Sequence, residues 1–225
     1  LCPSVFICVP NGGMMAGEPR RTSLYLIRHG AAEHHAQGRV GGWSDLGLTA
    51  RGRRQADALA RCLAEELGGT PWRLACSDLG RAVQTAEAIG RALGVLPQPM
   101  AALREHSCGI VDGMLATEAV GHYIEPTEPL ADWMSYPGAE TWREVYLRVI
   151  PCVEQLLQED GPVLVVTHKI PIHLTLCWWL GLPLESEPSV WFDVDVGSVT
   201  RLREEAWGAH TVLGVNDTAH LRDVQ

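Results

Sequence analysis

Short apolar runs alternate with longer amphipathic stretches along the chain. Residues 23–27 (SLYLI) and 72–76 (WRLAC) are short runs with β character, and residues 162–168 (PVLVVTH) show no polar alternation. Runs of this length predict strands, and a strand without alternation is expected to be buried on both faces of a sheet. Residues 198–204 and 210–215 predict two further strands near the end of the sequence.

The amphipathic stretches predict helices between these strands. Residues 49–67 carry apolar side chains at helical spacing, at Ala56, Leu59, Ala60, Leu63 and Leu67. Thr49 is the expected N-cap of this helix, and Gly68 with Gly69 is the expected end. The same spacing predicts helices over residues 77–93, 140–158 and 170–182.

Strands that alternate with helices predict an α/β fold, a three-layer sandwich with a mostly parallel central sheet and helices on both faces. We expect residues 23–225 to form one domain. Residues 1–22 begin at Leu and hold only a short apolar run without a basic leader, which favours an N-terminal extension outside the fold. Residues 30–48 and 101–139 are long and irregular, and we expect the second, here called the lid segment, to cover the site.

Composition and charge narrow the function. The chain has 225 residues and a formal net charge of −9, so nucleic acids and membrane surfaces find no general attraction. No run approaches the roughly 18 apolar residues of a membrane span. The seven cysteines lack CxxC spacing, which indicates reduced thiols in a cytoplasmic protein. The sequence has neither an HExxH motif nor a Cys/His cluster with ligand spacing, so it predicts no metal site.

Candidate chemistry lies where two predicted strands end. His29 follows the first strand and His168 ends the Val-rich one. Ligands bind beyond the carboxyl ends of strands in parallel sheets, so these two histidines are expected to face one another. A histidine can be a nucleophile, and Gly30 permits close backbone approach. Arg28-His29-Gly30 alone fits a polar strand end equally well.

Two further residues are candidates on weaker signals. Ser77 or Asp78 is expected to cap the helix over 77–93, which puts Arg81 in its first turns, where a cation opposes the helix dipole. A bound anion would explain this placement, and a solvated surface arginine is the alternative. Glu105 lies in the lid segment before two glycines and could act as an acid beside a phosphate, or form a loop salt bridge.

Taken together, these motifs resemble the histidine phosphatase superfamily (branch 1), which includes the phosphoglycerate mutases. The matching residues are Arg28, His29 and Gly30, then Ser77, Leu79, Arg81, Thr85 and Ala86, then Leu103, Glu105, Gly109 and Gly113, and finally His168. The resemblance spans about residues 23 to 221.

The resemblance implies a phosphoglycerate mutase-like fold and a division of labour in the site. His29 would attack phosphorus and form a phosphohistidine. Arg28, Arg81 and His168 would bind the non-bridging oxygens, and Glu105 would be the general acid and base. No metal or other cofactor is implied.

The sequence also departs from the family pattern. His35 stands where many relatives have a phosphate-contacting asparagine, and it could still donate a hydrogen bond. Lys169 follows the second histidine and would add a cation at the pocket rim, or be a solvated side chain. His34 and His35 could bind an adventitious metal ion, which we consider the weaker interpretation.

The expected reaction is hydrolysis of a small-molecule phosphate monoester. Residues 125–138 (EPTEPLADWMSYPG) make the lid segment acidic and aromatic, which argues against a small polyanionic substrate. Trp133, Met134 and Tyr136 favour an apolar or ring-bearing leaving group, or else pack the lid's own core. A phosphoglycerate-type mutase or phosphotransferase is one alternative, and a non-catalytic module that binds phosphorylated ligands is a second. A homodimer is left open.

Overall fold

A mixed six-stranded sheet is the centre of the computed structural model, which describes residues 22–184 and 190–224. The strands are β1 (Thr22–Arg28), β2 (Arg73–Ser77), β3 (Gln98–Met100), β4 (Val163–Thr167), β5 (Val199–Glu204) and β6 (His210–Asp217). Their order is β3-β2-β4-β1-β5-β6. The first four in this order are mutually parallel, while β5 and β6 are antiparallel to their neighbours. The mostly parallel α/β fold predicted from the sequence is confirmed.

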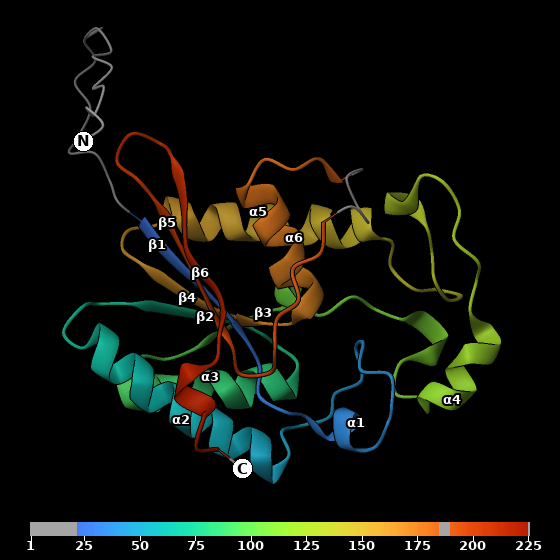
Figure 1. Cartoon of the computed structure of the whole chain (residues 1–225), viewed down its shortest axis with the longest axis horizontal. Coiled ribbons are helices and arrows are strands. Elements are labelled where there is room, and N and C mark those ends of the chain that lie inside the picture. The colour runs from blue at the N-terminus through green and yellow to red at the C-terminus, as the bar shows by residue number, and fades with distance from the viewer. Residues whose placement is uncertain (1–21, 185–189, 225) are drawn as a thin grey trace, which may run out of the picture.

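Helices cover both faces of the sheet (Figure 1). One face carries α2 (Ala50–Leu67) and α3 (Gly80–Leu93), and the other carries α5 (Trp142–Gln158) and α6 (Lys169–Trp179). Shorter helices are α1 (Glu33–Ala36) and α4 (Ala116–Ala119), with 3₁₀ turns at Ala101–Leu103, Gly109–Val111, Val120–His122, Leu130–Asp132 and Ala219–Leu221. Successive side chains of β1 point to opposite faces of the sheet. Leu24 and Leu26 pack toward α5 and α6, and Tyr25 and Ile27 pack toward α2 and α3.

The ends of α2 agree with the sequence prediction, whereas the start of α3 does not. The Thr49 side chain accepts a hydrogen bond from the Gly52 N–H at 2.9 Å, and Gly68 follows the last helical residue. Ser77 is the last residue of β2, and helix α3 begins only at Gly80, so Leu79 is the residue that directly precedes the helix. The expected capping by Ser77 or Asp78 is therefore wrong.

The cap of α3 comes from a distant part of the chain. The Asp45 carboxylate accepts a hydrogen bond from the Gly80 N–H at 2.6 Å. Asp78 binds the Arg104 guanidinium through both carboxylate oxygens, each at 2.7 Å. A carboxylate engaged in such a fork is not available to the helix end, so Asp45 takes that role.

The two irregular segments meet beyond the carboxyl edge of the sheet. Val40 N–H donates to Met114 O at 2.9 Å, and Gly113 N–H donates back to Val40 O at 2.9 Å. Figure 1 shows α1 and the lid segment at the same end of the molecule. These contacts place both segments over the strand ends that carry the candidate residues.

Residues 1–21 lie outside the described part of the chain, so the expected extension over 1–22 stays a prediction for them, while Thr22 begins β1. No helix within residues 22–184 and 190–224 is both long enough and apolar enough to cross a bilayer.

Candidate active site

The two histidines of the strand ends lie side by side. Arg28 and Thr167 are paired in register at the ends of β1 and β4, and His29 N–H donates to Thr167 O at 3.1 Å. His168 follows Thr167 as the N-cap of α6. The ring centroids of His29 and His168 are 4.9 Å apart in an edge-to-face arrangement. The parallel pairing of β1 with β4 thus produces the facing histidines expected from the sequence.

Hydrogen bonding fixes the tautomer of His29. Its Nδ1 lies 2.7 Å from the Gly30 carbonyl oxygen, which can only accept, so Nδ1 carries the proton. The Nε2 atom then has the lone pair, and the Arg81 Nε–H donates to it at 3.3 Å. Burial and the positive charges of Arg81 and Arg28 hold the pKa of His29 well below its ordinary value of 6.5. His29 is therefore a neutral imidazole with an unprotonated Nε2 at pH 7.

Arg81 is a buried residue and not a solvated surface arginine, since its relative exposure is 1%. Its guanidinium donates to Ser44 O at 2.8 Å and to Gly42 O at 2.7 Å, so the loop before α2 wraps around it. Thr85, one turn further along α3, accepts from the Gly30 N–H at 3.2 Å and donates to Arg81 O at 2.8 Å. This residue ties the helix to the end of β1.

Arg28 and His168 have unsatisfied polar atoms. Arg28 donates from one guanidinium nitrogen to Val194 O at 2.6 Å, but its buried Nε has no partner among the described residues. Neither ring nitrogen of the fully buried His168 has a partner there either. Burial and the nearby Arg81 charge hold the pKa of His168 well below 6.5. Because unpaired buried donors are costly, both side chains are suited to an oxygen-rich ligand.

His35 stacks on the nucleophile candidate. Its ring centroid is 5.9 Å from that of His29 with an interplanar angle of 17°. The Ala32 N–H donates to His35 Nδ1 at 3.1 Å, so the neutral ring carries its proton on Nε2. Burial and the charges of Arg28 and Arg81 lower the pKa of His35 to about 4. His35 is thus a neutral hydrogen-bond donor, as its expected role requires.

His34 packs against His35 with ring centroids 3.9 Å apart, and burial is the main cause that lowers its pKa to about 3. The described residues contain no group of three or more His, Cys, Asp or Glu side chains that could hold a metal ion.

Glu105 is oriented by backbone donors. One carboxylate oxygen accepts from the His106 N–H at 2.9 Å and from the Ile170 N–H, in the first turn of α6, at 3.3 Å. The Glu105 carbonyl oxygen accepts from Trp43 Nε1 at 2.7 Å and from Arg148 at 2.8 Å. These bonds hold one carboxyl oxygen and the backbone carbonyl of Glu105 in place within the lining of the site.

Arg148 is a supporting residue that the sequence interpretation missed. Its guanidinium also donates to Ala102 O at 2.9 Å and Arg104 O at 2.7 Å, and it binds both oxygens of Glu140 at 2.7 and 2.8 Å. A signal was available, because position 148 falls three residues after the buried Val145 on the inner face of α5. A cation at such a position marks a buried polar network.

Most of these side chains line a pocket of about 380 Å³, while the fully buried His168 is outside the lining and lies against the His29 ring. The lining residues are Arg28, His29, His34, His35, Arg39, Gly41, Gly42, Arg81, Glu105, His106, Cys108, Lys169 and Ile170. Four cationic side chains face one carboxylate, so the pocket is positive although the chain carries a net charge of −9. Such a pocket attracts small anions.

Comparison with known proteins agrees with this geometry. Residues 24–218 match the family model of the histidine phosphatase superfamily (branch 1). The chain belongs to that superfamily. The 6-phosphofructo-2-kinase/fructose-2,6-bisphosphatase of Caenorhabditis elegans is 31% identical over 195 residues, 85% of this chain and 41% of the relative. Isoform 1 of the human enzyme is 31% identical over 190 residues, 83% of this chain and 38% of the relative. The chain thus spans about two fifths of the length of these curated relatives.

Solved structures of the superfamily share the fold. A mycobacterial glucosyl-3-phosphoglycerate phosphatase superposes with a TM-score of 0.73 at 26% identity, over 88% of this chain and 100% of that one. A phosphoglycerate mutase from Bacillus anthracis superposes with a TM-score of 0.71 over 91% of this chain and 96% of that one, and at 23% identity it supports the fold alone.

Two residues singled out as substrate contacts lie elsewhere in this superfamily member. Trp133 and Tyr136 both pack against Tyr123, with ring centroids 5.6 and 5.9 Å away, and Trp133 Nε1 donates to Ile124 O at 3.0 Å. Neither lines the pocket, nor does any acidic residue of 125–138. The structure therefore does not bring these lid residues to the site, and the acidic lid gives no argument against a polyanionic substrate.

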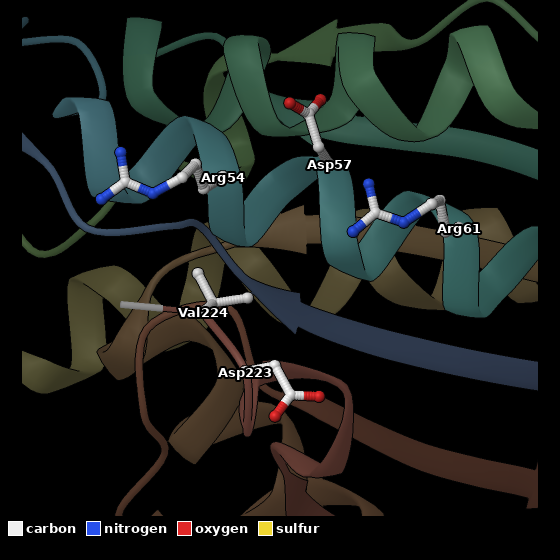
Figure 2. A pocket seen from close by; sticks show the side chains of 5 residues that line it. All are labelled: Arg54, Asp57, Arg61, Asp223 and Val224. Carbon is white, nitrogen blue, oxygen red and sulfur yellow. The ribbon is translucent and has the colours of Figure 1, made fainter.

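A larger hollow of about 560 Å³ lies on another part of the surface, between α2 and the C-terminal segment (Figure 2). Arg54, Asp57 and Arg61 come from the helix, and Asp223 and Val224 come from the segment opposite. Its two cations and two carboxylates balance, and it holds none of the residues that carry chemistry. The smaller pocket is therefore the candidate active site.

Proposed function

We propose that the protein is a metal-independent phosphatase that hydrolyses a small-molecule phosphate monoester through a phosphohistidine on His29. The observation that carries the proposal is the buried, neutral His29, whose proton is held on Nδ1 by Gly30 O while Nε2 faces Arg81. Phosphoryl transfer depends mainly on positioning and charge neutralisation, and the pocket offers both.

In the first step His29 Nε2 attacks phosphorus as the bond to the leaving oxygen breaks. Arg28, Arg81 and His168 bind the non-bridging oxygens, and the Nε2–H of His35 adds a further donor. The step requires Glu105 as the neutral carboxylic acid, which gives its proton to the leaving oxygen and becomes the carboxylate. These groups supply the transition-state stabilisation that a metal ion supplies in other phosphotransferases.

In the second step Glu105, now a carboxylate, takes a proton from water. The water oxygen attacks phosphorus, the Nε2–P bond breaks, and His29 returns to its neutral state. A pocket of about 380 Å³ supports a small substrate. The names of the relatives, a fructose-2,6-bisphosphatase and a glucosyl-3-phosphoglycerate phosphatase, point to the same reaction class. A cytoplasmic location, favoured by the cysteine spacing in the sequence, is part of this proposal.

The test is phosphate release from a panel of sugar, nucleotide, aryl, phosphoglycerate and phosphoamino acid monoesters, in the presence of EDTA. We expect release by the wild type, none above background by His29→Ala, and full release by His122→Ala, an exposed histidine outside the pocket. A quenched sample should contain acid-labile phosphate on the protein, and His29→Ala should not. Retained release in His29→Ala would refute the mechanism.

The alternative that an observation favours is a mutase or phosphotransferase. Arg39 and Lys169 line the pocket beyond the residues assigned to the transferred phosphate, and they could hold a phosphorylated acceptor. This alternative predicts transfer to an added acceptor or dependence on a bisphosphate primer, with little free phosphate. Binding of phosphorylated ligands with neither release nor transfer would instead indicate a binding module.

A further inference from the structure

Lys169 is a pocket cation without a place in the proposed phosphate chemistry. Its Nζ lies 2.6 Å from Asp193 Oδ1 and 5.5 Å from the centroid of the Trp191 ring. The Lys169 side chain is 32% exposed and that of Asp193 is 73% exposed. An ion pair this exposed contributes little to folding, so stability alone does not account for it.

The Lys169 ammonium adds its positive charge to the positive end of helix α6. Lys169 is the first residue of α6, where a cation opposes the positive end of the helix dipole. His168 precedes it, and Arg28 is close enough to help lower the pKa of Asp193, an effect that comes mainly from the hydrogen bond with Lys169. Asp193 thus serves as the counter-ion of a site that would otherwise attract an external anion.

Arg28 and Arg81 are assigned to the transferred phosphate in the function proposed above, which leaves Arg39 and Lys169 among the pocket cations. Arg81 binds two backbone carbonyls and faces His29. Arg39 donates to Gly113 O at 2.8 Å and to the Gln37 side chain at 3.2 Å. The Lys169 ammonium has three donors, and a single weakly buried carboxylate is its ion-pair partner.

We propose that Lys169 binds a second anionic group, a phosphate or a carboxylate, on the leaving group of the substrate, and that this group displaces Asp193. The proposal rests on the function proposed above and names its substrate class, a small phosphate ester with a second negative charge. Asp193 is then an internal competitor that lowers affinity for such substrates. Trp191, stacked on the buried His173 with ring centroids 4.5 Å apart, is a rigid support beside the ammonium.

The rival explanation is that the ion pair only fastens the segment around Asp193 to α6. It predicts that removal of either charge has the same effect on every substrate. Displacement predicts opposite signs: loss of Lys169 weakens the second anion site, whereas loss of the Asp193 charge frees it.

The experiment measures kcat/KM for matched substrate pairs. Glycerol 3-phosphate and 3-phosphoglycerate differ by a carboxylate, and glucose 6-phosphate and glucose 1,6-bisphosphate differ by a phosphate, so the two pairs separate the two anion types. For the member of a pair that carries the second anionic group we expect Lys169→Met to lower kcat/KM about 10-fold, the effect of one charge-assisted hydrogen bond. We expect Asp193→Asn to raise it about threefold, as suits an exposed pair. Lys169→Arg should restore most of the loss.

Neither variant should change kcat/KM for the member without the second anionic group by more than about twofold, the scale of an exposed pair. The control is Glu159→Gln, which breaks the exposed 2.9 Å pair with Arg73 outside the pocket and should leave both members unaffected. Added salt should reduce the Lys169→Met effect, because the interaction is partly screened.

Binding in a His29→Ala background tests the inference without turnover. Calorimetric titration with the same compounds should show the same order of affinities in the Lys169 and Asp193 variants. Absence of phosphate release by the wild type, together with this order of affinities in the His29→Ala background, would overturn the proposed hydrolysis and retain the anion site. The anion site would be overturned if Lys169→Met and Asp193→Asn lowered kcat/KM equally. It would also be overturned if the variants had the same effect on both substrates of each pair.

Discussion

Removal of the Arg148 guanidinium should destabilise the protein strongly. Arg148 and Glu140 are 19% and 16% exposed, and the arginine also donates to the backbone carbonyls of Ala102, Arg104 and Glu105. Arg148→Met keeps the length of the stem but leaves a carboxylate without its partner in a mostly buried site. Breaking one side of such a pair costs about 3–5 kcal/mol. For a chain of this size that corresponds to a fall in Tm of roughly 6–20 °C.

The pH dependence of this loss identifies its cause. Burial would raise the pKa of Glu140, but hydrogen bonds from Arg148 and the Ser107 N–H outweigh burial, and the pKa lies below its ordinary value of 4.5. A depressed pKa stabilises the fold above the unfolded-state pKa, and this contribution is lost as pH falls through the folded-state pKa. In Arg148→Met the unpaired carboxylate is costly when charged. The difference from wild type should therefore shrink as the pH is lowered from 7.5 to 4.5.

The assay is urea unfolding of the wild type and variants at both pH values. Arg143→Met is the matched control, because Arg143 lies on the same helix and pairs with Asp132 at 38% and 46% exposure. It should cost less than about 1 kcal/mol. Arg148→Met combined with Glu140→Gln should be more stable than Arg148→Met alone. A cost under 1 kcal/mol for Arg148→Met, or one that grows at low pH, would refute the reasoning.

Three further predictions concern the site and its support. In a ¹⁵N NMR titration His29 should remain neutral with its proton on Nδ1 down to pH 5.5, because its pKa lies well below 6.5; protonation near 6.5 would contradict this. Gly30→Ala should destabilise the fold in thermal unfolding, since its Cβ would stand 2.6 Å from a backbone oxygen, whereas Gly121→Ala meets nothing within 4 Å and should be tolerated. Asp45→Ala removes the hydrogen bond that caps the Gly80 N–H and should lower the free energy of unfolding in urea by about 1 kcal/mol. An unchanged free energy of unfolding would mean that water replaces the Asp45 cap.

The parts of the structure that could be predicted from the sequence have short-range causes. The periodic apolar residues of α2 and the apolar run of β4 follow from local spacing. The juxtaposition of His29 and His168 follows from one general rule, that parallel strands end at the same edge. By contrast β3 (Gln98–Met100) has three residues and only partial burial, so its sequence carries no strand signal. It forms because the edge of β2 offers backbone partners.

The features that could not be predicted from the sequence have long-range causes. Asp45 caps α3 across 35 positions, and no local pattern distinguishes it from the equally plausible Ser77 and Asp78. The aromatic residues of the lid fitted either a contact with substrate or a core of the lid itself, because composition does not say which way a loop turns its side chains. The rings of Trp133 and Tyr136 pack edge-to-face against Tyr123, which is also part of the lid segment.

The histidines around the pocket explain how a site rich in titratable groups can have a stable charge. Burial together with Arg28 and Arg81 lowers the pKa of His29, His34, His35 and His168. All four stay neutral at pH 7, so the positive charge of the pocket resides on Arg28, Arg39, Arg81 and Lys169. A neutral ring offers one donor and one lone pair, and the hydrogen bond at the other nitrogen decides which faces the ligand. Backbone hydrogen bonds leave His29 with an unprotonated Nε2 and His35 with a protonated one, so two chemically identical side chains fit the opposite roles that the proposed mechanism gives them.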